Sequence, residues 1–318
     1  MPRPEHSRQT HPPTSEYNHL KPPSHAERQR AVSIVSKYLA ALFKGTFTAG
    51  GYQQGALVDF TTAKQPLTQE IIIFGDLHAR LDHLKRILEH DGNLIKIRQG
   101  RAILLPLGDI VHRQSYNRLE LLEMASSVET FHFLAELKTK YPTAVYPLLG
   151  NHDFLETALS KQGIEQSLLF RDHIQRRFGS EYVAYYRGAL MAGALVAVGP
   201  GFVALHGGPI KGARSLQQIR EIKIQDRPHL FQDPLQWEAT NNRMLVDKPD
   251  YGPKDVQRFL ELCGQPDGVL IVGHTPPRKN FWKDEVIPGK HYVLDASNPD
   301  SLGYVRIRAG VPEFVTII

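Results

Sequence analysis

Five short clusters of metal-ligand residues are spread along the chain, and each of them follows an apolar run. Together they offer carboxylates, an amide oxygen and several imidazoles. This mixture of hard oxygens and borderline nitrogens suits Mn, Fe, Zn, Ni or Co better than Mg or Ca alone. Any one cluster is ordinary turn chemistry, but five in series predict one shared metal site. The clusters are Gly75-Asp76-Leu77-His78, Gly108-Asp109-Ile110-Val111-His112-Arg113, Gly150-Asn151-His152-Asp153, Leu205-His206-Gly207-Gly208 and Val272-Gly273-His274-Thr275.

The apolar runs in front of these clusters predict strands, and helical patterns separate several of them. Residues 71–74 and 102–105 are short runs, with leucine and isoleucine at helical spacing between them. A longer helical pattern covers about residues 117–138, and residues 144–149 form the next run. Runs that alternate with helices indicate an α/β fold. Ligands of such folds bind at the carboxyl ends of the strands, so we expect the clusters to meet there.

The order of the clusters carries a resemblance to a known family. The chain resembles the calcineurin-like metallophosphoesterases, and specifically their phosphoprotein phosphatase branch with its bacterial members. The family pattern reads GDxHG, GDxVDRG, GNHE, HGG and GH, and this chain has GDLHA, GDIVHR, GNHD, HGG and GHT between about residues 71 and 307. The resemblance implies a four-layer αββα sandwich, in which two packed mixed β-sheets are flanked by helices.

The resemblance also implies a role for individual residues. Asp76 and His78 would hold a first metal ion, and Asp109 would bridge it to a second. Asn151, His206 and His274 would hold the second ion. The two ions would be divalent or trivalent, with manganese foremost and Fe, Zn, Ni or Co as alternatives, and no other cofactor is implied.

Three further residues have catalytic roles by the same resemblance. His152 would be the general acid that protonates the leaving oxygen. Arg113 would clamp the phosphate, because its planar guanidinium matches phosphate oxygens bidentately. Arg243, in the segment Thr240-Asn241-Asn242-Arg243, stands where the family often has a second clamp arginine.

The chain departs from the family pattern at three positions. His112 replaces the aspartate that orients the general acid, so His152 would be held differently, with Asp153 and Asp172 as candidate partners. Ala79 replaces a glycine, which is a small change if the backbone there is helical. Asp153 replaces a glutamate and shortens a supporting side chain.

The implied function is hydrolysis of phosphomonoesters, on Ser/Thr or Tyr phosphoproteins or small esters, by a metal-bridging hydroxide. A dinucleoside polyphosphate hydrolase or a phosphodiesterase with the same dinuclear site is an alternative. An inactive scaffold that binds phosphorylated partners is a third hypothesis, motivated by His112. We find no signature of a nucleic-acid-binding module.

Composition agrees with a cytoplasmic protein that acts on an anionic substrate. The 318 residues carry a formal net charge of +5, which favours anions. The single cysteine, Cys263, excludes an internal disulfide. Glycine and proline at 199–201 interrupt the apolar stretch 188–208, so we interpret it as two short strands and not as a membrane span. The sequence does not set an oligomeric state.

The chain divides into a tail and one domain. Residues 1–25, rich in proline and histidine, are expected to be disordered. Residues 26–318 would form a single metallophosphoesterase domain, with a helix over residues 26–44 in the lead-in 26–65 and a catalytic core at 70–318. Segments 154–186 and 211–247 are candidate walls of the substrate site.

Overall fold

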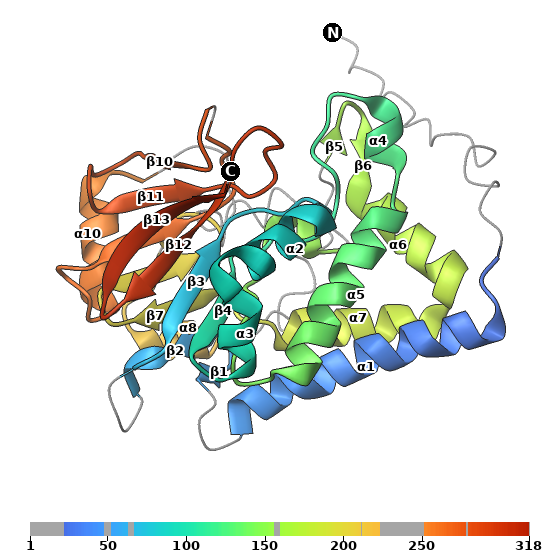
Figure 1. Ribbon diagram of the computed structural model, residues 1–318, viewed down its shortest axis with the longest axis horizontal. Helices are drawn as coiled ribbons and strands as arrows, with labels where there is room; N and C mark the ends of the chain where they lie inside the picture. Colours follow the sequence, from blue (N-terminus) through green and yellow to red (C-terminus); the bar gives the residue numbers. More distant parts are fainter. Residues whose placement is uncertain are drawn as a thin grey trace, which may run out of the picture.

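Two mixed β-sheets face each other across an apolar layer, and helices cover their outer faces (Figure 1). The computed structural model describes residues 22–47, 52–62, 67–155, 160–210, 212–222, 251–277 and 279–317. The predicted four-layer αββα sandwich is therefore confirmed. The predicted tail lies almost wholly outside the described residues.

The larger sheet has seven strands, and its centre is built from parallel and antiparallel pairs. β7 and β8 form an antiparallel hairpin, and β8, β9 and β11 run parallel to one another. This hairpin confirms the two short strands predicted within residues 188–208. In spatial order the strands are β1 (Gln53–Gln54), β2 (Leu57–Asp59), β7 (Val196–Gly199), β8 (Phe202–Leu205), β9 (Val269–Val272), β11 (His291–Leu294) and β10 (Trp282–Asp284).

The smaller sheet has four strands, and β3 and β4 within it are buried on both faces. Along one strand, Ile71 and Ile73 point into the layer between the sheets, whereas Ile72 and Phe74 pack under the helices. This alternation follows from the period of two residues in a strand. A strand covered on both faces is apolar throughout, which explains the uninterrupted run at 71–74. The spatial order is β13 (Val311–Ile317), β12 (Leu302–Arg308), β3 (Glu70–Phe74) and β4 (Ala102–Pro106).

The helices form the two outer layers. α2 and α3 pack on the small sheet, and α1, α6, α7 and α10 contribute to the cluster on the large sheet (Figure 1). α5 contributes to both clusters. Their bounds are α1 (His25–Phe47), α2 (Leu81–Glu89), α3 (Asn93–Arg98), α4 (Arg118–Leu122), α5 (Ala125–Lys140), α6 (Gln166–Phe178), α7 (Ser180–Ala192), α8 (Leu216–Arg220) and α10 (Pro253–Leu262). A short hairpin, β5 (Ser160–Lys161) with β6 (Ile164–Glu165), lies beside α4 (Figure 1).

Three sequence predictions of secondary structure need correction. α1 ends at Phe47, three residues past the predicted end at residue 44. The single helix predicted over residues 117–138 is divided into α4 and α5, because Glu123 is extended and its carboxylate accepts the backbone N–H of Ser126 at 3.0 Å. The run at 144–149 makes isolated bridges to β4 and to Ala194 and is not a regular strand.

Among the described residues, no helix combines the length and the apolar character that a membrane crossing requires. The apolar stretch near residue 188 is accounted for by the end of α7 and the β7–β8 hairpin.

A lysine is buried at the end of α5. The side chain of Lys138 is 0% exposed, its Nζ donates to the carbonyl of Pro142 at 2.7 Å, and it lies 4.3 Å from the centre of the Tyr146 ring. Burial, with no ion pair to a carboxylate in the described part of the chain, lowers the pKa of Lys138 to about 7. The charged amine therefore opposes folding at neutral pH.

We expect stability to rise with pH through this lysine. Between pH 7 and 9 the unfolded chain keeps the proton that folded Lys138 has lost, so the free energy of unfolding rises with pH. The contribution is about 2 kcal/mol over that window, and Lys138→Met should remove it. Urea denaturation at both pH values measures the slope. The exposed Lys140→Met is the matched control, and equal slopes in the Lys138 variant and the wild type would contradict the assignment.

Candidate active site

The five clusters converge on one buried site. Two groups of ligand atoms form there, Asp76 with His78 and Asp109, and Asp109 with His206 and His274, and within each group the atoms lie within 4.8 Å of one another. Asp109 belongs to both groups. The Nε2 of His78 lies 3.7 Å from Asp76 and 3.8 Å from Asp109, and the Nε2 of His206 lies 3.3 Å from Asp109.

The strands of both sheets bring these residues together. Asp76 and Asp109 follow β3 and β4 of the small sheet, and His206 and His274 follow β8 and β9 of the large sheet. Each of these strand pairs is parallel, so the carboxyl ends lie at one edge. An isolated parallel bridge between Asp76 and Asp295 joins the two edges. The site therefore lies where the carboxyl ends of the two sheets meet.

Asn151 completes the second group. Its Oδ1 lies 2.9 Å from the Nε2 of His206 and 2.9 Å from the Nδ1 of His274, and these two nitrogens are 3.1 Å apart. Three polar atoms from three loops thus point at one position. This is the arrangement that a shared cation requires of its ligands.

The hydrogen bonds of the histidines show that a cation fits these positions. The Nδ1 of His206 donates to the carbonyl of Leu107 at 3.0 Å, and the Nδ1 of His78 donates to the carbonyl of His112 at 2.9 Å. The neutral ring of His206 then directs the lone pair of Nε2 at the oxygens of Asn151 and Asp109, which is unfavourable unless positive charge lies between them. The Nε2 of His78 lies near the carboxylates of Asp76 and Asp109 and accepts from the amide of Gln114, a hydrogen bond whose place a metal ion would take. Burial lowers the pKa of His206, but Asp109 and Asp76 outweigh it and raise the pKa to about 9. Either a proton or a metal ion can supply that charge, and the donor set suits a transition metal.

Two glycines allow the loops to come this close. A Cβ on Gly150 would meet the Oδ1 and backbone N of Asp109, and a Cβ on Gly273 would meet the Oδ1 of Asp76. A side chain at either position would displace a metal-ligand carboxylate.

Sequence comparison agrees with this geometry. A family profile described as Calcineurin-like phosphoesterase matches residues 70–298. The chain belongs to this family. It is a metallophosphoesterase, a hydrolase of phosphate esters whose family implies divalent metal ions.

Solved structures show the same fold in other phosphatases. A protein serine/threonine phosphatase from Saccharomyces cerevisiae, described as similar to human phosphatase PP5, aligns with a TM-score of 0.57 at 14% identity, over 92% of this chain and 90% of that one. A cold-active protein tyrosine phosphatase aligns with a TM-score of 0.50 at 14% identity, over 84% and 83%. The cold-active protein-tyrosine phosphatase of a psychrophilic Shewanella species aligns at 0.49 and 15%, over 81% and 82%. At these identities the likeness is one of fold.

The ligand loops of this metallophosphoesterase contain strained backbone. Residues His78, Ala79, Asp109, His112 and His274 have φ angles of 45°, 60°, 50°, 66° and 72°. Left-handed backbone costs a non-glycine residue about 1–2 kcal/mol, and such strain is typical of functional sites. The condition under which the change at Ala79 would be small is not met: its backbone is left-handed, so the replacement of glycine there has a cost.

Asp153 holds two metal-ligand loops together. Its carboxylate accepts the backbone N–H groups of Asp109 at 3.0 Å, Ile110 at 2.8 Å and Gly150 at 2.8 Å. Burial and the charge of Asp109 raise the pKa of Asp153 to about 6. The side chain is therefore engaged with backbone, and the suggestion that Asp153 orients His152 was wrong. The other candidate, Asp172, is half-exposed on α6 and pairs with Arg171 at 3.3 Å.

We expect Asp153→Ala to destabilise the fold. It would leave three buried N–H groups without an acceptor, and each costs about 1–3 kcal/mol. Urea denaturation in the presence of chelator, where metal binding contributes nothing, should show a loss of at least about 3 kcal/mol. Asp153→Asn retains one acceptor oxygen and should lose less. A loss below about 1 kcal/mol in the alanine variant would show that the loops are held by other contacts.

His152 and His112 lie side by side. Their ring centres are 5.5 Å apart, and the ring of His152 is 5.0 Å from that of His78. Burial holds the pKa of His152 well below its usual value and lowers the pKa of His112 to about 3, so His112 is neutral at pH 7. Neither ring nitrogen of His112 has a hydrogen-bond partner among the described residues, and the same holds for Nδ1 of His152. No described carboxylate replaces the orienting aspartate of the family pattern.

Of the two predicted clamp arginines, the structure describes Arg113 alone. The Nε of Arg113 donates to the Oγ of Ser126 at 3.2 Å and lies 3.7 Å from the carboxylate of Glu123, at the junction of α4 and α5. Arg243 lies outside the described residues. Both phosphate-clamp roles stay predictions.

Two residues at the site were missed by the sequence reading. The Nε2 of Gln114 lies 2.9 Å from the Nε2 of His78. The sequence could have drawn attention to Gln114, because it replaces the glycine at the end of the family pattern GDxVDRG. Asp295 is buried beside Asp76, and burial together with the charge of Asp76 raises its pKa to about 6. It lies in the last core segment, with no motif to mark it.

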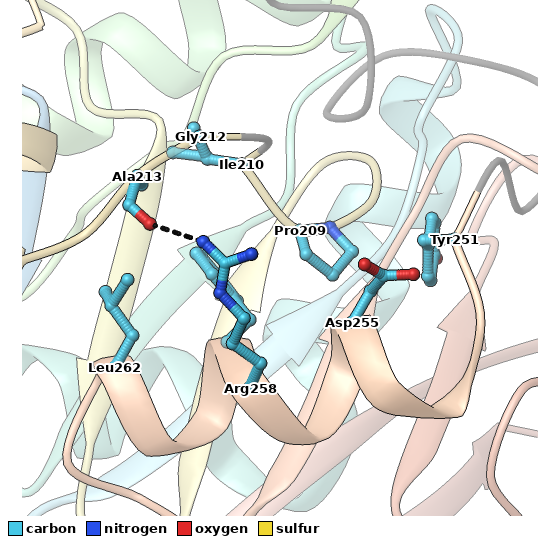
Figure 2. A pocket seen from close by; sticks show the side chains of 9 residues that line it. Pro209, Ile210, Gly212, Ala213, Tyr251, Asp255, Arg258 and Leu262 are labelled. Atoms are coloured by element: carbon cyan, nitrogen blue, oxygen red, sulfur yellow. Dashed lines mark hydrogen bonds between the residues drawn. The ribbon is translucent and has the colours of Figure 1, made fainter.

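A cavity of about 210 Å³ opens directly after the His206-Gly207-Gly208 cluster. It lies between the loop at Pro209 and α10, and the guanidinium of Arg258 crosses it to donate to the carbonyl of Ala213 at 3.2 Å (Figure 2). Asp255 lies at its edge (Figure 2) and accepts the backbone N–H of Gly252 at 2.9 Å, which caps α10. The cavity adjoins one of the segments predicted as a substrate wall.

Proposed function

We propose that this metallophosphoesterase hydrolyses phosphomonoesters at a pair of metal ions, manganese foremost. The first would be held by Asp76, His78 and Asp109, and the second by Asp109, Asn151, His206 and His274. The observation that supports a pair is that the carboxylate of Asp109 belongs to both groups of ligand atoms. One residue shared by two groups is expected where two cations lie close together.

The protein prepares this site before substrate arrives. The ions, when bound, supply Lewis acidity that activates water and stabilises negative charge. The carbonyls of Leu107 and His112 fix the tautomers of His206 and His78, so that Nε2 of each ring faces the metal positions. Asp153 holds the loops that carry Asp109 and Asn151 in register.

His152 is the residue we assign to protonate the leaving oxygen. Its backbone N–H donates to the Oδ1 of Asp109 at 2.7 Å, which places the ring next to the metal ligands. Because Nδ1 is buried, the proton leaves from Nε2. The pKa of His152 is low in the absence of substrate. It rises when a phosphate dianion binds beside the ring, since negative charge favours the protonated imidazole.

We place phosphoproteins first among the substrates, at serine, threonine or tyrosine, with small phosphate esters next. The fold shared with solved serine/threonine and tyrosine phosphatases supports this order without choosing between them. The runner-up is a phosphodiesterase or dinucleoside polyphosphate hydrolase with the same ligands.

A substrate panel with and without metal tests the proposal. We expect turnover of p-nitrophenyl phosphate and of phosphopeptides with Mn²⁺, and none with chelator. Turnover of bis-p-nitrophenyl phosphate or of dinucleotides in preference to the monoester would favour the runner-up. Bound metal without turnover of any substrate would favour the scaffold hypothesis motivated by His112.

A further inference from the structure

The β5–β6 hairpin is hydrogen-bonded to residues 113–118, which follow the second metal-ligand cluster. The Nη1 of Arg118 donates to the carbonyl of Gln162 at 3.2 Å, and the Nε2 of Gln162 donates to the carbonyl of Tyr116 at 3.2 Å. The buried Gln166, just after the hairpin, donates to the carbonyl of Arg113 at 3.1 Å. Hairpin, loop and α4 therefore form one unit, with β5 and β6 next to α4 in Figure 1.

This unit brings a lysine to the metal ligands. The Nζ of Lys161 in β5 donates to the Oε1 of Gln114. The Nε2 of the same amide lies 2.9 Å from the Nε2 of His78, the nitrogen that faces Asp76 and Asp109. A single amide group thus separates the ammonium of Lys161 from a metal-ligand imidazole. A phosphate that approaches the ions from this side meets the ammonium.

The arginine expected to bind phosphate contacts the junction of α4 and α5. The Nε of Arg113 donates to the Oγ of Ser126 at 3.2 Å and lies 3.7 Å from the carboxylate of Glu123. The side chain next to it in sequence, Gln114, turns toward His78 instead. Among the described residues, Lys161 is the cation that hydrogen bonds connect to a metal ligand, through the amide of Gln114.

We propose that Lys161, positioned by Gln114, binds the phosphate group of the substrate and favours monoesters over diesters. The inference rests on the proposed function, because it concerns the same metal site. A monoester phosphate carries about two negative charges near pH 7, and a diester carries one. Coulomb attraction to a fixed ammonium is about twice as large for the dianion. Lys161 is thereby a binding residue that sets specificity.

The test is phosphate binding by the full-length, Mn²⁺-loaded protein. Inorganic phosphate is titrated calorimetrically into the wild type, Lys161→Gln and Lys161→Arg, with the exposed Lys140→Gln as the matched control. A lost charge-assisted contact should weaken phosphate binding by about 10- to 100-fold in Lys161→Gln. Lys161→Arg retains the charge, so its affinity for phosphate should lie within about threefold of the wild-type value. Lys140→Gln should bind phosphate as the wild type does.

Steady-state kinetics give the second measurement. In Lys161→Gln we expect a higher KM for p-nitrophenyl phosphate, little change in kcat, and a smaller preference for it over bis-p-nitrophenyl phosphate. Wild-type affinity for phosphate in Lys161→Gln would overturn the inference. The inference would also be overturned if Lys161→Gln and Lys161→Arg lost phosphate affinity equally and both melted at a lower temperature. That result would mean that Lys161 only stabilises the structure.

The binding measurement separates this inference from the proposed function. Phosphate binding that depends on Lys161 in a protein without metal-dependent turnover would sustain the inference and refute the function. Turnover with Mn²⁺ together with unchanged phosphate binding in Lys161→Gln would do the opposite.

Discussion

Asp109→Asn should abolish hydrolysis of phosphate esters. The substitution removes the charge of the one residue that belongs to both groups of ligand atoms, so neither cation would be held as before. Loss of a single stabilising group in an active site costs about 10²–10³-fold in rate, and we expect at least this from a residue that serves two ions. Turnover and metal content, measured together by an assay with Mn²⁺ and by elemental analysis, should both fall.

The asparagine variant is a fair test because it conserves the local structure. Asp109 has φ of 50°, a conformation that asparagine tolerates. Its Oδ1 accepts the backbone N–H of His152, and the amide oxygen of asparagine can do the same. Stability in chelator should therefore stay near that of the wild type. Asp172→Asn, on the exposed side of α6, controls for the loss of a carboxylate. Full activity in Asp109→Asn would refute the dinuclear site.

His152→Asn should slow turnover by about 10²–10⁴-fold, the usual contribution of general acid catalysis. Metal content should not change, because His152 contacts Asp109 through its backbone and its ring belongs to neither group of ligand atoms. If the variant loses metal, the ring is a ligand and the assigned role is wrong.

The leaving group supplies an internal control for this second variant. A p-nitrophenolate ion leaves readily without a proton, whereas an alkoxide does not. The loss in His152→Asn should therefore be smaller for p-nitrophenyl phosphate than for a serine phosphopeptide. An equal loss on both substrates would indicate that His152 positions the phosphate and does not donate the proton.

The layers and the convergence of the site were predictable because they follow from patterns that sequence carries directly. The run at 71–74 is apolar on both faces, which requires a strand between two layers, and the following Asp76 then has to lie at the carboxyl end. The same reasoning placed Asp109, His206 and His274. Order along the chain and the period of strands were sufficient for these residues.

Side-chain direction was not predictable, because it depends on contacts between distant segments. Arg113 turns toward Glu123 only because α4 ends there, and a continuous helix had been expected at that point. Asp153 faces three backbone N–H groups from two loops, and its sequence gives no sign of them. The left-handed backbone at Ala79 is equally invisible in the sequence, because alanine does not favour it.

The hydrogen bonds of Asp153 to two loops affect how the enzyme binds its metal ions. The carboxylate ties the segments of Asp109 and Asn151 by hydrogen bonds that involve no metal. Small zinc domains, in contrast, fold only as the ion binds, so their uptake is inseparable from chain ordering. In this chain we expect the two sheets and the hydrogen bonds of Asp153 to order these segments without help from a metal ion. Exchange of one ion for another should then proceed without unfolding of the chain.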